Sequence, residues 1–133
     1  MAQPWWPIPS TIMASTAIPE LQTHQLHMGA AIAMAQSSVT KGNHPFGAVL
    51  VLDGEIVCTA ENTVHSDNDA TCHAESNLCS IANKQLSVEQ RKQATLYTST
   101  EPCPMCSGAI YWPVKFLRNR LQRKYAATAF IVA

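Results

Sequence analysis

The sequence predicts an α/β domain with three layers, in which helices cover both faces of a β-sheet. Its elements alternate in the order α-β-β-α-β-α, which favours this architecture. One strand-like run, GAVLVL at 47–52, is continuously apolar, as a strand buried on both faces would be. The 133 residues fit one ordinary domain, and a hydrophobic content of 47% supplies a packed core. No apolar run reaches the roughly 18 residues of a membrane span, so we expect no membrane association.

Residues 1–18 form an apolar, Pro-rich segment that we expect to be a disordered or loosely packed extension. Pro4, Pro7 and Pro9 would interrupt an apolar helix, and the segment has no basic start, so it does not resemble a signal peptide. We therefore expect a cytoplasmic protein whose five cysteines are reduced.

A first helix is predicted over about 19–38. Apolar residues recur there at helical spacing, and Pro19 suits a first turn. The tripeptide at 41–43, Lys-Gly-Asn, ends it. His24 and His27 lie three residues apart on this helix, but no third ligand is in view, so we expect both to be solvated.

A β-hairpin follows the first helix. Two β-rich runs, 47–52 and 55–60, are separated by Asp53–Gly54, which is the strongest short hairpin signal. Next come a polar, turn-rich loop at 62–71 and a helix from Cys72 to about Lys84.

The last elements of this series are a strand and a short helix. ATLYTST at 94–100 has strand composition. Pro102 and Pro104 then open a helix that Pro113 ends.

Two motifs at predicted helix starts carry the chemistry: CHAE at 72–75 and EPCPMC at 101–106. A catalytic zinc site uses three nitrogen or sulfur ligands and keeps one position open. His73, Cys103 and Cys106 would supply the three ligands, because the Cys-x-x-Cys spacing lets both sulfurs face one ion. A helix N-terminus favours the thiolates that a metal needs.

Glu75 lies two residues after His73, close to the expected metal without being needed as a ligand. Such a carboxylate can take a proton from a water molecule and deliver it to the substrate. The combination H-x-E followed by P-C-x-x-C is the known signature of zinc-dependent deaminases.

The stretches HPFGAVLV, ENT, CHAE and LYTSTEPCPMCSGAIYW resemble the zinc-dependent nucleobase and nucleoside deaminases of the cytidine deaminase superfamily. The resemblance covers roughly 20–112 and is greatest to the guanine deaminase and tRNA-adenosine deaminase branch. It divides the chain into the extension 1–18, a zinc deaminase domain at 19–112 and a basic, divergent tail at 113–133.

The resemblance implies roles for eight residues and a hydrolytic reaction that releases ammonia. His73, Cys103 and Cys106 match the ligands of Zn²⁺, and Glu75 matches the proton shuttle. Four others match substrate contacts: the Asn62 amide, the Ala74 backbone N–H, and the aromatic pocket walls Phe46 and Trp112.

Plainer interpretations stay open beside these roles. The two cysteines could form a structural zinc clip closed by Cys72, or a redox pair. Cys72 would face away from His73 if both were helical, and the neighbouring Glu75 favours catalysis. Taken alone, Asn62 is typical of a turn, Phe46 and Trp112 of a core, and Cys58 and Cys79 of small buried hydrophobic side chains.

The C-terminal part departs from the family pattern. Only residues 113–133 follow Trp112, which is fewer than the strands and helices that complete the family fold require, so we expect these elements to be incomplete, as in a truncated or alternatively spliced chain. The tail could form a helix at 114–124 and a strand at 125–132, with an exposed sheet edge beyond the last paired strand.

The function predicted from these observations is zinc-dependent hydrolytic deamination of a purine base or nucleoside, with guanine as first choice. The partners expected are a small nucleobase or nucleoside and a second copy or a relative of this chain. Nucleic acid is expected to be unlikely, because nine acidic and only four basic residues precede Pro102. The alternatives are a tRNA adenosine deaminase-like activity and a catalytically impaired, zinc-binding partner subunit.

Overall fold

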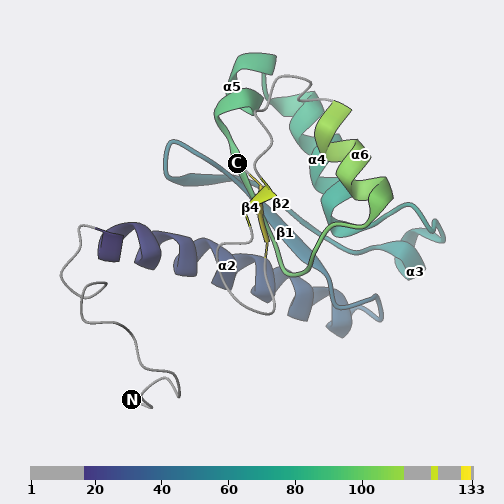
Figure 1. Ribbon diagram of the computed structural model, residues 1–133. Helices are drawn as coiled ribbons and strands as arrows, with labels where there is room; N and C mark the ends of the chain where they lie inside the picture. The colour runs from purple at the N-terminus through teal and green to yellow at the C-terminus, as the bar shows by residue number, and fades with distance from the viewer. Residues whose placement is uncertain (1–16, 113–120, 123–129, 133) are drawn as a thin grey trace, which may run out of the picture.

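The computed structural model describes residues 17–112, 121–122 and 130–132 (Figure 1). The predicted boundaries after residues 18 and 112 fall at the limits of these ranges. The domain division therefore stays a prediction, and most of the proposed extension and tail lies outside the described residues.

A five-stranded antiparallel sheet forms the middle layer, in the order β2-β1-β3-β5-β4. The strands are β1 (Gly47–Leu52), β2 (Glu55–Glu61), β3 (Thr95–Thr98), β4 (Leu121–Gln122) and β5 (Phe130–Val132). As its continuously apolar sequence predicts, β1 lies between two other strands and is buried along nearly its whole length.

The predicted hairpin joins β1 to β2. Asp53 and Gly54 both have positive φ, at 52° and 80°, which is the backbone that a two-residue hairpin turn requires. The register runs from Gly47 opposite Glu61 to Leu52 opposite Glu55, with one irregularity next to Leu50.

Helices cover both faces of the sheet, which confirms the three-layer prediction (Figure 1). One face is covered by α2 (Ala17–Thr40) and the other by α4 (Ala74–Gln85) with α6 (Pro104–Tyr111) beside it. Within the described residues, no helix combines the length and the apolarity needed to cross a membrane.

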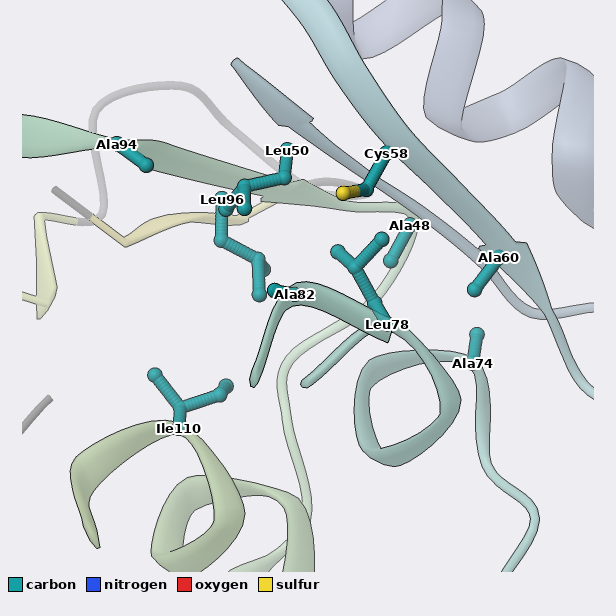
Figure 2. Packing of buried hydrophobic residues seen from close by; sticks show 10 residues of the cluster. All are labelled: Ala48, Leu50, Cys58, Ala60, Ala74, Leu78, Ala82, Ala94, Leu96 and Ile110. Atoms are coloured by element: carbon teal, nitrogen blue, oxygen red, sulfur yellow. The ribbon is translucent and has the colours of Figure 1, made fainter. Parts of the chain in front are cut away.

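Successive side chains of the central strands point to opposite faces and build two cores. Val49 and Val51 of β1 and Tyr97 of β3 face α2 and form one core with Met28 and Ala31 of that helix. Ala48 and Leu50 belong to the larger core under α4 and α6 (Figure 2). That core consists of Ala48, Leu50, Cys58, Ala60, Ala74, Leu78, Ala82, Ala94, Leu96 and Ile110.

Two predicted small hydrophobic cysteines lie in or against this larger core. Cys58 is buried within it, and Cys79 is half-buried against it. Burial raises the pKa of the Cys79 thiol to about 12, so this thiol stays protonated and unreactive at neutral pH.

The chain between β2 and β3 differs from the prediction in three places. A short helix, α3 (Val64–Asp67), interrupts the loop. The helix expected from Cys72 begins at Ala74, because His73 has extended backbone and acts as its N-cap. A further helix, α5 (Val88–Gln93), was not predicted. Its start is marked in the sequence by Ser87 and, three residues later, Gln90, which form a capping box.

The prediction that His24 and His27 are solvated is wrong. His27 is only 4% exposed, and its ring lies 5.2 Å from that of Tyr97 on β3. His24 is half-buried, with Nδ1 2.6 Å from the Tyr97 hydroxyl oxygen. Both histidines therefore share the helix face that carries Met28 and Ala31 onto the sheet.

The C-terminal strands agree with one expectation and correct another. β5 lies within the strand expected at 125–132 and pairs with β3 from Leu96 opposite Val132 to Thr98 opposite Phe130, and β4 is the outermost strand. The helix expected at 114–124 is wrong at Leu121–Gln122, because these residues form β4 and pair with β5. The rest of that predicted helix lies outside the described residues.

At Gly47 the backbone of β1 lies against α2 without room for a side chain, so a substitution at this position tests the packing. A Cβ atom there would press against the Ala31 carbonyl oxygen and the Ala35 amide nitrogen and lie 2.6 Å from Met34 Cβ. Gly47→Ala is expected to lower the free energy of unfolding by about 3 kcal/mol in urea denaturation, because helix backbone cannot yield cheaply.

Gly29→Ala in α2 is the matched control. No atom lies within 4 Å of its added Cβ, so this variant is expected to be stabilised by up to about 1 kcal/mol. Unchanged stability of Gly47→Ala would contradict the close contact between β1 and α2.

Candidate active site

Two helix N-termini meet beside the sheet and bring the two sequence motifs together. His73 is the N-cap of α4, and Cys103 is the N-cap of α6, with Pro104 as the first residue of the helix. Both caps have extended backbone, and the Cys103 sulfur lies over the start of α6, within reach of the Cys106 N–H. The predicted cluster thus arises from residues 30 positions apart in sequence.

The three predicted metal ligands lie at distances that suit zinc. His73 Nδ1 is 3.6 Å from Sγ of Cys103 and 3.6 Å from Sγ of Cys106, and the three atoms all lie within 4.8 Å of one another. Tetrahedral zinc, with bonds of about 2.1 Å to nitrogen and 2.3 Å to sulfur, separates such atoms by about 3.5 Å. The donor set and its spacing therefore fit a zinc ion.

The described residues include every Cys and His of the chain, and they contain no second group of this kind. Cys72 does not belong to the cluster. It precedes α4 just as His73 does, so the argument that one helix points the two side chains apart does not hold. A structural clip closed by Cys72 is therefore not supported, and three protein donors leave room for a fourth, non-protein ligand.

Cys106 is the buried ligand of the cluster, and burial keeps its sulfur protonated as long as no metal is bound. Without a metal, burial raises the pKa of the Cys106 thiol to about 12, and the neighbouring Glu75 carboxylate adds to the shift, while a hydrogen bond with Ser76 opposes it. Metal binding at neutral pH must therefore displace a proton from this sulfur. The Cys106 backbone N–H also lies 3.5 Å from Cys103 Sγ, which it can stabilise as a thiolate.

Glu75 lies directly behind the cluster and is only 3% exposed. Its Oε1 accepts a hydrogen bond of 2.8 Å from the Thr98 hydroxyl, and its Oε2 is 3.6 Å from Cys106 Sγ. One oxygen is thus held by β3, and the other faces a candidate metal ligand. This is the placement that a proton-transferring carboxylate beside a metal needs.

Phe46 and Asn62 are brought together at the ends of β1 and β2. The Asn62 backbone N–H donates to the Phe46 carbonyl at 3.0 Å, and the Asn62 side chain is 1% exposed. Its Oδ1 accepts from the Val64 N–H at 3.1 Å, whereas its Nδ2 has no hydrogen-bond partner within the described part of the chain. The amide group is therefore held by its oxygen and has donor capacity left.

Ala74 and Trp112 occupy different surroundings. Ala74 is fully buried as the first residue of α4, so its backbone N–H has no partner within the helix. Trp112 is 67% exposed at the end of α6 and lines a groove of about 580 Å³ between α4 and α6. None of the other seven predicted site residues lines that groove.

Three residues that the sequence did not single out hold the site in place. Thr98 binds Glu75, and Asn77 donates from Nδ2 to the Glu61 carbonyl at 3.0 Å and to the Thr63 hydroxyl at 2.9 Å. Asn77 thereby ties the segment around Asn62 to α4. The sequence did hold a signal for Thr98, because it lies two residues after the core residue Leu96 and so shares its face of the strand.

Asn43 is the third of these residues and organises the two loops near Phe46. Its Oδ1 accepts from the backbone N–H groups of His65 and Ser66, both at 3.0 Å, and its Nδ2 donates to the Ser66 hydroxyl at 2.7 Å. The rings of His44 and His65 consequently lie 4.8 Å apart.

Comparison with known proteins shows what this arrangement is similar to. The family model for the cytidine and deoxycytidylate deaminase zinc-binding region matches residues 21–115. Guanine deaminase of Bacillus subtilis is 46% identical over 90 residues, which are 67% of this chain and 58% of that protein. A tRNA-specific adenosine deaminase of the same organism is 42% identical over 86 residues, 65% of this chain and 53% of that protein.

Solved structures show the same relationship. The X-ray structure of the Bacillus subtilis guanine deaminase superposes with a TM-score of 0.63 at 45% identity, covering 68% of this chain and 58% of that one. The chain spans between half and three fifths of the length of these two curated relatives. The expectation that nucleic acid is an unlikely partner is not supported, because a tRNA deaminase is among the relatives.

The cluster makes a direct prediction about metal binding. Cys103→Ser is expected to weaken zinc binding by at least about 100-fold, because it removes one of only three protein donors. The measurement is zinc content after dialysis, followed by competition with a chromophoric chelator.

Cys72→Ser is the matched control, since Cys72 adjoins His73 but lies outside the cluster, and it is expected to keep one zinc per chain. Full zinc occupancy with unchanged affinity in Cys103→Ser would rule out this ligand.

Proposed function

Because the chain belongs to the cytidine and deoxycytidylate deaminase zinc-binding family, we propose that it catalyses hydrolytic deamination of a purine base or nucleoside, with guanine as first choice. The observation that carries the proposal is the buried Glu75 carboxylate, whose Oε2 faces the cluster of His73, Cys103 and Cys106. Burial of a carboxylate lowers the stability of the fold, so a carboxylate in this position indicates a functional role. Proton transfer next to a bound metal is such a role.

In this proposal His73, Cys103 and Cys106 hold the zinc. A bound zinc supplies Lewis acidity, which makes a water molecule nucleophilic near neutral pH. Oε2 of Glu75 takes the two protons of the attacking water in turn and passes one to a ring nitrogen and the other to the amino group. The water oxygen bonds to the amino-bearing ring carbon, the carbon–nitrogen bond breaks, and the amino group leaves as ammonia.

Three further residues hold the purine in position. Asn62 offers Nδ2 as a donor to an acceptor on the base or sugar, and Ala74 offers its backbone N–H to a base carbonyl. Phe46, half-buried beside Asn62, supplies an apolar wall for the ring. Trp112 is assigned to this pocket only by the family resemblance.

Two relatives are named for purine substrates and support a purine here, whereas a third, 40% identical over 101 residues, is named a probable cytosine deaminase. The guanine deaminase is the more similar by identity, and it favours a free base. The tRNA-specific adenosine deaminase favours a purine within RNA, and the five basic residues after Glu101 are the feature of this chain that suits such a partner.

The test is ammonia release by zinc-loaded protein from guanine, guanosine, adenine, adenosine, cytosine and a tRNA anticodon stem-loop. We expect guanine to give the highest kcat/KM. If folded, zinc-loaded protein releases no ammonia from any of them, the deaminase proposal fails and a non-catalytic partner subunit is favoured.

Glu75→Gln is expected to lower kcat by about 10²–10⁴-fold while one zinc per chain remains bound, because it removes the proton carrier and no metal ligand. Steady-state kinetics together with metal analysis checks both parts.

Glu89→Gln is the matched control. Glu89 is exposed on α5 and forms an ion pair with Lys92, so its variant should retain full activity. A Glu75→Gln enzyme as active as the parent would exclude the proton-shuttle role.

A further inference from the structure

Thr98 makes the only hydrogen bond to the Glu75 carboxylate from a side-chain hydroxyl within the described residues. It is fully buried on β3, and its Oγ1 lies 2.8 Å from Glu75 Oε1. The Gly47 carbonyl oxygen, at 3.5 Å, is the other acceptor within reach. A hydroxyl has one proton, and the shorter, charge-assisted bond to the carboxylate takes it.

This bond makes the two carboxylate oxygens of Glu75 different from each other. Oε1 is occupied by the Thr98 hydroxyl, whereas Oε2 faces Cys106 Sγ at 3.6 Å. Rotation of the carboxylate would break the bond to Thr98 and leave an unpaired oxygen in a buried position. The bond from the Thr98 hydroxyl to Oε1 therefore fixes the carboxylate with Oε2 on the side of the metal cluster.

We propose that Thr98 is a positioning residue, which orients Glu75 so that Oε2 alone carries the proton. This inference rests on the proposed function, since it concerns the same reaction. In the described part of the chain, the Thr98 hydroxyl has no hydrogen bond to the metal cluster or to the substrate contacts proposed above, so it acts through Glu75.

Thr98 can orient Glu75 because its strand is fixed by hydrogen bonds to β1. β3 pairs with β1, with Thr98 opposite Ala48, and the next residue, Ser99, is bonded to Gly47 in both directions. These bonds are 2.9 Å from the Ser99 N–H to the Gly47 carbonyl and 3.1 Å from the Gly47 N–H to the Ser99 hydroxyl. The hydroxyl thus stands on a fixed strand, while Glu75 belongs to the first turn of α4.

The kinetic test compares Thr98→Val, Thr98→Ser and Thr95→Val in zinc-loaded protein. Thr98→Val keeps the shape but lacks the hydroxyl, so we expect kcat to fall by about 10–100-fold, with KM changed less than about twofold and zinc content unchanged. Thr98→Ser restores the hydroxyl and should return kcat to within about threefold of the parent. Thr95→Val, on the same strand, should have no effect on kcat.

A second measurement does not depend on activity. Thr98→Val should lower the melting temperature of the zinc-loaded protein by several degrees when Glu75 is present, because it leaves Oε1 buried without a donor. In a Glu75→Leu background the same substitution should leave the melting temperature unchanged or raise it.

The outcomes separate this inference from the proposed function. An active parent whose Thr98→Val variant keeps its kcat overturns the role of Thr98 and leaves the deaminase proposal standing. A loss of kcat that Thr98→Ser does not rescue, or an equal melting-temperature shift in both backgrounds, also overturns it. A parent protein that releases no ammonia overturns both proposals.

Discussion

The site depends on one packing arrangement, in which α4 and α6 lie side by side on the same face of the sheet with their N-termini together. Small core residues such as Ala74 and Ala82 let α4 lie close to β1 and β2, and Ile110 brings α6 onto the same core (Figure 2). The N-cap residues of the two helices then lie next to each other, with His73 Nδ1 3.6 Å from Cys103 Sγ. The field of a helix N-terminus favours thiolates, but burial of Cys106 outweighs it and raises the pKa of this thiol.

The buried Glu75 carboxylate is the second constraint. Removing a carboxylate from water is unfavourable unless donors replace the water, and here the donor comes from β3. The same end of β3 is fixed to Gly47 on β1, and the missing side chain at Gly47 lets α2 approach from the opposite face. The orientation of one carboxylate is thus linked to the packing of all three layers.

Local patterns in the sequence predicted much of this structure. The Asp53–Gly54 hairpin, the buried strand β1 and the cluster of His73, Cys103 and Cys106 follow from turn preference, apolar patterning and ligand spacing. What failed depended on long-range contacts. Only the tertiary structure shows which helix face the sheet covers, and this decides the burial of His27.

The same limit applies to the end of the chain and to Thr98. Leu121–Gln122 forms a strand because β5 is available to pair with it, and helical propensity carries no information about that partner. Strand periodicity places Thr98 on the α4 face of the sheet, but that its neighbour there is Glu75 follows only from the packed structure.

X-ray absorption spectroscopy at the zinc edge of the metal-loaded protein tests the central claim most directly, namely that three protein ligands leave one position for water. We expect two sulfur ligands at about 2.3 Å, one histidine nitrogen at about 2.1 Å and one oxygen that exchanges with solvent. A third sulfur, or a fourth protein donor in place of the oxygen, would indicate a closed structural site and contradict the proposed chemistry.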